Sequence, residues 1–279
     1  MAAKILDGKV LAAKIKARIA DEVKTMDTRP GLAVILVGDN PASRVYVTSK
    51  RKDCEECGFY SEEYTLPNDA KQEDLLELIR DLNNNDVIDG ILVQLPLPSQ
   101  INEKEVLLAI DPNKDVDGFH PMNVGKLMTG EPCFLPCTPA GVMALLDDGE
   151  IDVAGKHCVV LGRSNIVGKP QALLMLQKDA TVTICHSKTP DMAEQCRRAD
   201  ILVAAVGKTA LITPDMVRDG VVIVDVAMNR DENGKLCGDC CRATYEKASA
   251  FTPVPGGVGP MTRAMLMGNT LSAAKLHGK

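Results

Sequence analysis

Apolar residues recur at every fourth position near the start of the chain and then gather in short runs between polar segments. Leu11, Ile15, Ile19 and Val23 predict one apolar face of a first helix. The pattern that follows predicts strands at 32–37, 60–65 and 88–95, alternating with helices at 42–57 and 70–83. This alternation is typical of a mostly parallel sheet with helices on its faces.

The same alternation returns in the second half of the chain. Residues 111–139 are rich in Pro, Gly and Asn and only briefly periodic, which indicates a functional loop leading to an interdomain connection. Beyond it the pattern predicts strands at 157–162, 180–185, 201–206 and 221–226 and helices at 139–147, 166–177, 190–198 and from about 260 to 276. The fold class is therefore α/β with two domains, the second a Rossmann-type doubly wound parallel sheet.

The domain boundaries follow from these elements. We expect residues 1–138 to form the first domain, residues 139–253 the second, and the C-terminal segment 254–279 to return to the first. The 279 residues suit two domains of ordinary size, and 45% apolar with 25% charged residues is typical of a globular protein.

Charge and composition exclude several classes of protein. A net charge of −6 argues against nucleic acid as the main partner. The N-terminal segment has no apolar signal core, and no stretch approaches the ~18 apolar residues of a membrane span. We therefore expect a cytoplasmic protein that binds no membrane.

Ten cysteines in such a chain indicate reduced thiols. Two groups have the spacing of metal ligands, namely Cys54 with Cys57, and Cys237 with Cys240 and Cys241. The first pair lies in a charged helical run, and no histidine is near either group. We therefore prefer small buried thiols to a structural zinc site and expect no metal.

A loop with two glycines follows the strand at 157–162 and leads into a helix. Gly162 would allow a tight turn and Gly168 a close approach of helix to strand, while the helix N-terminus would attract a phosphate. The loop departs from the usual dinucleotide pattern, because Ser164 holds the central position and the last glycine comes one residue late. The residues that we expect at this dinucleotide site are Gly162, Arg163, Ser164, Val167, Gly168, His186, Ser187 and Gly207.

The end of the next strand indicates which dinucleotide is bound. NAD enzymes usually place Asp or Glu there to hold the ribose 2′-hydroxyl. Here Cys185–Lys188 contains no acid, and Arg163 adds a fixed positive charge. Both features favour a 2′-phosphate, so the sequence predicts NADP.

Polar residues in the first half predict a second site. Tyr46 and Lys50 lie one helical turn apart, although that spacing alone is more often a solvated lysine beside an amphipathic tyrosine. Short-chain dehydrogenases share Tyr-x-x-x-Lys, but there it follows the cofactor strand. Gln94 ends an apolar strand, where its amide must be hydrogen-bonded. Asp115 and Asp117 lie in the loop beyond, and either could cap a turn.

Six motifs occur in order along essentially the whole chain. They are VGDNPAS (37–43) with Tyr46 and Lys50, QLPLP (94–98), KDVDG (114–118), PCTP (136–139), GRS (162–164) with VGKP (167–170), and PGGVGPMT (255–262). In this order and spacing the chain resembles the family of bifunctional methylenetetrahydrofolate dehydrogenase/methenyltetrahydrofolate cyclohydrolases. The resemblance implies NADP-dependent oxidation of 5,10-methylenetetrahydrofolate and hydrolysis of the product to 10-formyltetrahydrofolate, in the one-carbon metabolism that supplies purine biosynthesis.

The resemblance also implies roles for particular residues. Lys50 would be the catalytic lysine, oriented by Gln94, and Tyr46 would stack on or orient the folate. Asp117 would accept hydrogen bonds from the pterin. The loop residues Pro255, Gly256 and Gly257 would let the backbone approach the substrate. A homodimer paired through the cofactor domains, and a cleft that holds folate and nicotinamide face to face, are implied as well.

Two positions depart from the family pattern, both in the expected cofactor domain. Ala227 stands where a glycine is expected, and residues 240–245 replace a valine-containing turn. Two other interpretations fit part of the pattern. A shikimate-type dehydrogenase would share the architecture but not QLPLP or PGGVGPMT. A non-catalytic nucleotide-binding protein would be expected to lack Tyr46, Lys50 or Asp117.

Overall fold

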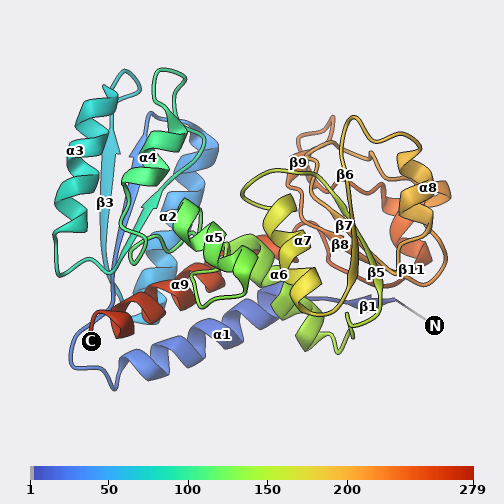
Figure 1. Cartoon of the computed structure of the whole chain (residues 1–279), viewed down its shortest axis with the longest axis horizontal. Helices are drawn as coiled ribbons and strands as arrows, with labels where there is room; N and C mark the ends of the chain where they lie inside the picture. The colour runs from blue at the N-terminus through green and yellow to red at the C-terminus, as the bar shows by residue number, and fades with distance from the viewer. Residues whose placement is uncertain (1–2) are drawn as a thin grey trace. The chain divides into compact units, whose positions relative to one another are not determined.

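The computed structural model describes residues 3–279, which form two compact units (Figure 1). We call them the three-strand unit, residues 13–137 and 263–279, and the six-strand unit, which contains the described residues before Ala13 and residues 138–262. No helix within the described residues is long and apolar enough to cross a membrane.

The three-strand unit is built on a parallel sheet with the order β3-β2-β4. Its strands are β2 (Gly31–Val37), β3 (Tyr60–Leu66) and β4 (Gly90–Val93). Its helices are α2 (Pro41–Cys57), α3 (Gln72–Asn83), α4 (Glu103–Ala109) and α5 (Pro121–Thr129), together with most of α1 (Gly8–Val23) and of α9 (Val258–Leu276). This order confirms the β-α-β-α-β alternation that the sequence predicted.

Every residue of the central strand β2 is buried. Leu32 and Val34 lie in one apolar cluster with residues of α1, α2 and α9, whereas Ala33 and Ile35 lie in another with residues of α3 and α4. Successive side chains of a strand point to opposite faces, so β2 must be apolar throughout when helices cover both.

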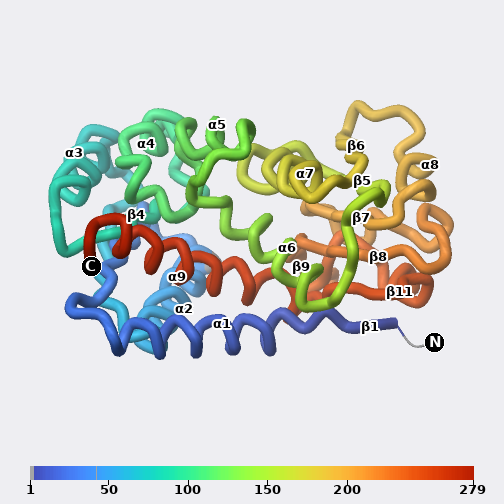
Figure 2. Tube along the Cα trace, turned by 60° about the horizontal axis from the view of Figure 1, so that its bottom comes forward, coloured from blue at the N-terminus to red at the C-terminus, as the bar shows by residue number. Residues whose placement is uncertain are grey.

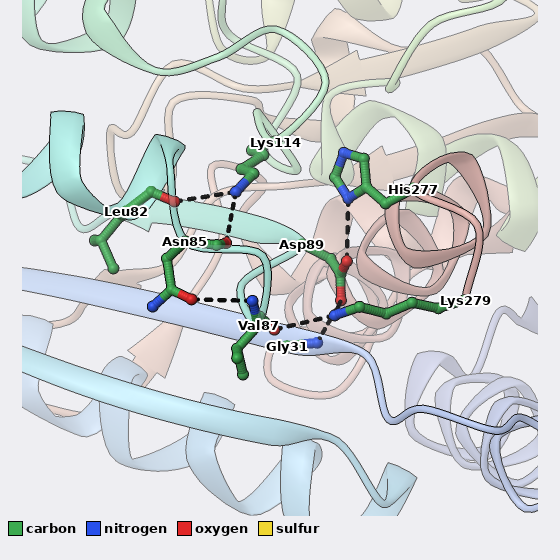
Figure 3. A network of polar contacts seen from close by, with 8 residues as sticks. All are labelled: Gly31, Leu82, Asn85, Val87, Asp89, Lys114, His277 and Lys279. Atoms are coloured by element: carbon green, nitrogen blue, oxygen red, sulfur yellow. Dashed lines mark hydrogen bonds and ion pairs between the residues drawn. The ribbon is translucent and has the colours of Figure 1, made fainter.

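A buried carboxylate closes the amino edge of this sheet (Figure 3). Asp89 is fully buried and accepts hydrogen bonds from the backbone N–H of Gly31, from His277 at 3.0 Å and from Lys279 at 2.9 Å. Beside it, Lys114 donates to two backbone carbonyls at the end of α3. This network binds His277 and Lys279 to the amino edge of the sheet. The candidate active-site residues lie at the opposite, carboxyl edge.

The six-strand unit contains a parallel sheet with the order β1-β11-β8-β7-β5-β6. Its strands are β1 (Lys4–Ile5), β5 (His157–Leu161), β6 (Thr181–Cys185), β7 (Ile201–Ala204), β8 (Val221–Asp225) and β11 (Ala248–Phe251). Its other elements are α6 (Cys137–Asp148), α7 (Gly168–Gln177), α8 (Met192–Arg197), a hairpin of β9 (Asn229–Arg230) and β10 (Leu236–Cys237), and 3₁₀ turns η1 (Pro214–Met216) and η2 (Arg242–Lys247). The strand order reverses between β5 and β7, as the Rossmann-type prediction requires.

The structure draws the boundary between the units differently from the sequence. Residues 1–138 were expected in the first domain, but β1 pairs with β11 and lies beside it in Figure 2, so the described residues before Ala13 belong to the six-strand unit. Residues 254–262 belong to the six-strand unit too. The chain returns to the three-strand unit at Arg263, not at residue 254 as expected. A two-residue strand carries no readable periodicity, and its pairing with a distant strand is not a local property of the sequence.

The expectation of an irregular loop at 111–139 was wrong for its middle part. Helix α5 lies there, with the His120 side chain accepting a hydrogen bond from the N–H of Met122. Pro121 occupies the first helical turn, and Gly130 ends the helix in a left-handed conformation with φ 77°. These are ordinary start and stop signals, which the high Pro and Gly content of the segment concealed.

Candidate active site and cofactor pocket

A buried lysine lies at the carboxyl edge of the three-strand sheet. Lys50, on α2, is 8% exposed, and its Nζ donates a hydrogen bond to Oε1 of Gln94 at 3.0 Å. Gln94 follows β4, and its own amide donates to the carbonyl of Leu95 at 2.8 Å. The expectation that a strand-end amide would be hydrogen-bonded is therefore confirmed, with Lys50 as one partner.

Burial and charge act against each other on Lys50. Burial lowers the pKa of the Lys50 ammonium, and the nearby carboxylate of Asp117 opposes that shift. Burial likewise raises the pKa of Asp117, and here the positive charge of Lys50 opposes it. Burial therefore acts against the charged form of each group, and the opposite charge of the partner acts in its favour.

The structure distinguishes the roles of Asp115 and Asp117, either of which could have capped a turn according to the sequence. Asp115 is buried and accepts hydrogen bonds from the backbone N–H groups of Phe119 and His120 and from the Asn123 side chain. Burial raises the pKa of Asp115 to about 6. Asp115 therefore anchors the loop, whereas Asp117 is the carboxylate that acts electrostatically on Lys50.

Tyr46 and a second cation lie near Lys50. Tyr46 is 36% exposed, and burial raises the pKa of its phenol while the positive charge of Arg263 opposes the shift. Arg263, on α9, is held by Asp53 of α2 at 2.9 Å, and its charge lowers the pKa of Lys50. Arg263 was not predicted, because its partner Asp53 is remote in the chain and the basic residue follows directly on a glycine-rich motif.

Two further residues complete this cluster. The Cys137 thiol is buried, donates to the Val116 carbonyl at 3.3 Å and lies close enough to interact with Asp117. Asn269, on α9, donates to the carbonyls of Val116 and Leu135 at 2.8 and 2.9 Å. Asn269 therefore fixes the loop that carries Asp117. A polar residue among the apolar ones of the last helix is the signal that could have revealed it.

The remaining thiols near α2 are buried. Cys54 lies against Met267, and Cys57 donates to the Lys16 carbonyl. Burial raises the pKa of Cys54 to about 12 and that of Cys57 to about 11. The interpretation of this pair as buried thiols is confirmed.

The six-strand unit contains a cavity of about 320 Å³ at the carboxyl ends of β5, β6 and β7. Its lining includes five residues that the sequence predicted, Gly162, Arg163, Ser164, His186 and Ser187. It also includes Cys185, Met192, Ala205, Val206, Lys208 and Leu211. Of these described lining residues none is an acid and two are strong cations, so the cavity suits a phosphorylated nucleotide. Val167, Gly168 and Gly207 are not among its lining residues.

The glycines of the loop after β5 have the geometry that the sequence predicted. Gly162 has φ 117°, and a Cβ there would lie 2.3 Å from the Ala205 carbonyl oxygen. A Cβ on Gly168 would lie 2.2 Å from the Gly162 oxygen. Ser164, at the central position of the loop, accepts hydrogen bonds at its Oγ from the N–H groups of Val167 and Gly168 at 3.1 and 3.3 Å. The hydroxyl thus stabilises the start of α7.

The other two regions singled out in the sequence lie in the six-strand unit as well. Ala227, where a glycine was expected, is 8% exposed. Its φ is not positive, so its backbone conformation does not require glycine. Gly256 has φ 113°, and a Cβ on Gly257 would lie 2.7 Å from Cβ of Thr252. Gly256 is therefore favoured by its backbone conformation, and Gly257 by close packing of the chain.

Comparison with known proteins gives matches over both units. Residues 6–117 match the family described as tetrahydrofolate dehydrogenase/cyclohydrolase, catalytic domain, and residues 136–278 match its NAD(P)-binding domain. The chain is 59% identical to bifunctional protein FolD of Ruminiclostridium cellulolyticum over 99% of both chains.

Two solved structures are similar over nearly their whole length. The bifunctional enzyme FolD, a methylenetetrahydrofolate dehydrogenase/cyclohydrolase of Campylobacter jejuni, is 51% identical with a TM-score of 0.97, covering 99% of each chain. The methylenetetrahydrofolate dehydrogenase-cyclohydrolase of Trypanosoma brucei, complexed with NADP cofactor and inhibitor, is 38% identical with a TM-score of 0.94, covering 99% of this chain and 98% of that one.

Proposed function

Because the chain belongs to the tetrahydrofolate dehydrogenase/cyclohydrolase family, we propose that it catalyses two consecutive reactions. In the first, 5,10-methylenetetrahydrofolate loses a hydride to NADP and becomes 5,10-methenyltetrahydrofolate. In the second, water adds to the methenyl carbon and 10-formyltetrahydrofolate is released. The observation that carries this proposal is the buried contact of Lys50 with Gln94, beside Asp117.

The hydrolytic step depends on proton transfer, and Lys50 is placed to perform it. Burial lowers the pKa of Lys50, so a larger share of it is neutral than of an exposed lysine. The neutral amine accepts a proton from the attacking water, and the ammonium returns a proton to the folate nitrogen when the carbon–nitrogen bond breaks. The second proton of the water leaves to solvent as the formyl C=O forms. Gln94 holds the amine in place through its Oε1.

The oxidation step needs positioning rather than an acid or base, because the lone pairs of the two folate nitrogens expel the hydride. When bound, NADP supplies the hydride acceptor. Asp117 accepts hydrogen bonds from the pterin, Tyr46 orients the folate, and the loop Pro255–Gly257 approaches it. These roles rest on the family motifs and on the position of Asp117 near Lys50.

The cavity after β5 binds the cofactor in this proposal. Gly162, Ser164, Val167 and Gly168 form the turn and helix start beside the phosphates, and Gly207 belongs to the loop after β7. Arg163, His186 and Ser187 supply donors to the 2′-phosphate. The absence of acids among the lining residues and the glycine geometry support this assignment.

A spectrophotometric assay of the purified protein tests the function directly. With methylenetetrahydrofolate and NADP, absorbance of NADPH and of the methenyl product should rise, and added methenyltetrahydrofolate should be consumed faster than in buffer. NAD should support a lower rate at equal concentration. If the protein neither reduces NADP nor accelerates methenyl hydrolysis, the proposal fails. A shikimate-type dehydrogenase would instead reduce NADP with shikimate.

The proposal includes a homodimer in the cytoplasm, as the family resemblance implies. Light scattering during size-exclusion chromatography should give twice the mass of one chain. A monomer mass at assay concentration would exclude the dimer without affecting the proposed chemistry.

A further inference from the structure

The loop that follows β7 forms one wall of the cofactor cavity. Val206 and Lys208 line the cavity together with Arg163 of the loop after β5. Between them Gly207 adopts a left-handed conformation with φ 77°. Consecutive N–H groups around such a residue form a concave surface that attracts anions.

A carboxylate of the chain itself fills this concave surface. Asp239 is fully buried, and its Oδ2 accepts hydrogen bonds from the N–H of Val206 at 2.6 Å and of Gly207 at 3.2 Å. Its Oδ1 accepts from the N–H of Lys208 at 2.7 Å and from the Asn229 side chain at 3.0 Å. Each oxygen therefore has two donors, and all three loop amides converge on one side chain.

A second buried carboxylate holds Asp239 in turn. Asp225, at the end of β8, accepts from the N–H groups of Asp239 and Cys240 at 3.0 and 2.8 Å, and from the Tyr245 hydroxyl at 2.8 Å. The turn lies so close to Asp225 that a Cβ on Gly238 would be 2.1 Å from Oδ2. The turn that carries Asp239 is thus fixed independently of the loop that Asp239 binds.

From this arrangement we propose that Asp239 is a positioning residue for cofactor binding. It holds residues 206–208 in the conformation in which the side chains of Val206 and Lys208 line the cavity. The same carboxylate occupies the anion-attracting amides, so a cofactor phosphate is excluded from them and must be bound by other residues of the cavity. This inference rests on the proposed function, since it assumes that NADP binds in this cavity.

Replacement by asparagine separates charge and acceptor geometry from size. The NH₂ group of the introduced asparagine takes the place of either Oδ1 or Oδ2, and each of these oxygens accepts two hydrogen bonds. An NH₂ group is a donor and cannot accept them. Asp239→Asn should therefore release the loop, and the KM and dissociation constant for NADP should rise about tenfold to a hundredfold. Methenyl hydrolysis requires no NADP and should stay within about twofold of the wild-type rate, since uncoupled sites change independently.

Two other variants keep the test decisive. Asn229→Ala removes one donor but leaves the carboxylate with its three amides, so it should fold and should raise the dissociation constant for NADP by a smaller factor. Asp219→Asn changes an 88% exposed aspartate of the same unit and should leave both activities unchanged.

The outcomes are distinguishable by measuring NADP binding, both activities and Tm on each variant. Weaker NADP binding with retained hydrolysis in Asp239→Asn, and in Asn229→Ala if the former does not fold, supports the inference. Unchanged NADP binding in the folded variants overturns it, as does an equal loss of both activities. If the wild type itself fails to bind NADP, the proposed function fails first.

Discussion

The two sites of this protein use buried charge in different ways. At the carboxyl edge of the three-strand sheet, Lys50 and Asp117 are partly or fully buried side chains whose pKa values burial shifts against their charged forms. In the six-strand unit, burial also raises the pKa of Asp225, but the carboxylates of Asp225 and Asp239 each accept several hydrogen bonds and hold backbone in place.

This difference matches what each site has to do. A group that moves a proton must be able to gain and lose charge near neutral pH, which incomplete solvation permits. A group that fixes a loop must stay an acceptor, which several N–H donors ensure. Mutations near Lys50 should therefore change mainly the rate of methenyl hydrolysis. Mutations at the cavity of the six-strand unit should change mainly the affinity for NADP.

The largest effect is expected from Lys50→Met. It removes the amine but keeps an unbranched apolar side chain in a buried position, and the rate of methenyl hydrolysis should fall by at least about 100-fold. Stopped-flow or steady-state absorbance of the methenyl group measures this rate. Lys52→Met, on the exposed side of the same helix, should be neutral. A hydrolysis rate near that of the wild type in Lys50→Met would remove Lys50 from the mechanism.

Arg163→Ala should affect only the cofactor. Loss of a charged donor to the 2′-phosphate should raise the KM for NADP roughly tenfold to a hundredfold and that for NAD far less. Initial rates with each cofactor give the comparison, and exposed Arg198→Ala is the matched control. Equal increases for the two cofactors would mean that the 2′-phosphate is bound by other residues.

Gly168→Ala tests the close contact between α7 and the loop after β5. The added methyl group would lie 2.2 Å from the Gly162 oxygen, so either part must shift, at a cost of about 1–3 kcal/mol in the free energy of unfolding. Denaturant unfolding measures the stability, and NADP affinity should fall with it. Gly125→Ala, whose methyl group would meet no heavy atom within 4 Å, should not destabilise the protein. Equal stability of the two variants would contradict the packing argument.

The smallest effect is expected from Arg263→Gln, measured as the pH profile of methenyl hydrolysis. The charge of Arg263 lowers the pKa of Lys50, so its removal should raise that pKa. Because the neutral amine accepts the proton, the rising limb of the profile should move to higher pH. Exposed Arg18→Gln should leave the profile in place. A rising limb that stays in place, or moves to lower pH, would show that the charge of Arg263 does not lower the pKa of Lys50.

Local signals determined much of this protein. Most strands and helices of the two sheets follow from hydrophobic periodicity, although β1, β11, α4 and α5 were not predicted. Gly162 and Gly168 follow from the spacing of a loop between strand and helix. The lack of an acid at Cys185–Lys188 is likewise a local observation, and the cavity beside it contains none among its described lining residues. Each of these features depends on residues close together in the chain, where side-chain pattern and backbone geometry are directly linked.

Tertiary structure alone decided the rest. The sequence could not say which of Asp115 and Asp117 anchors its loop, nor that Arg263 lies near Lys50, nor that Asp239 binds the backbone of residues 206–208. These relations join residues far apart in the chain, brought together where parallel strands end at a common edge and helices pack over them. Whether such a residue keeps its charge depends on burial and on the donors around it, and neither can be read from the sequence before the chain is folded.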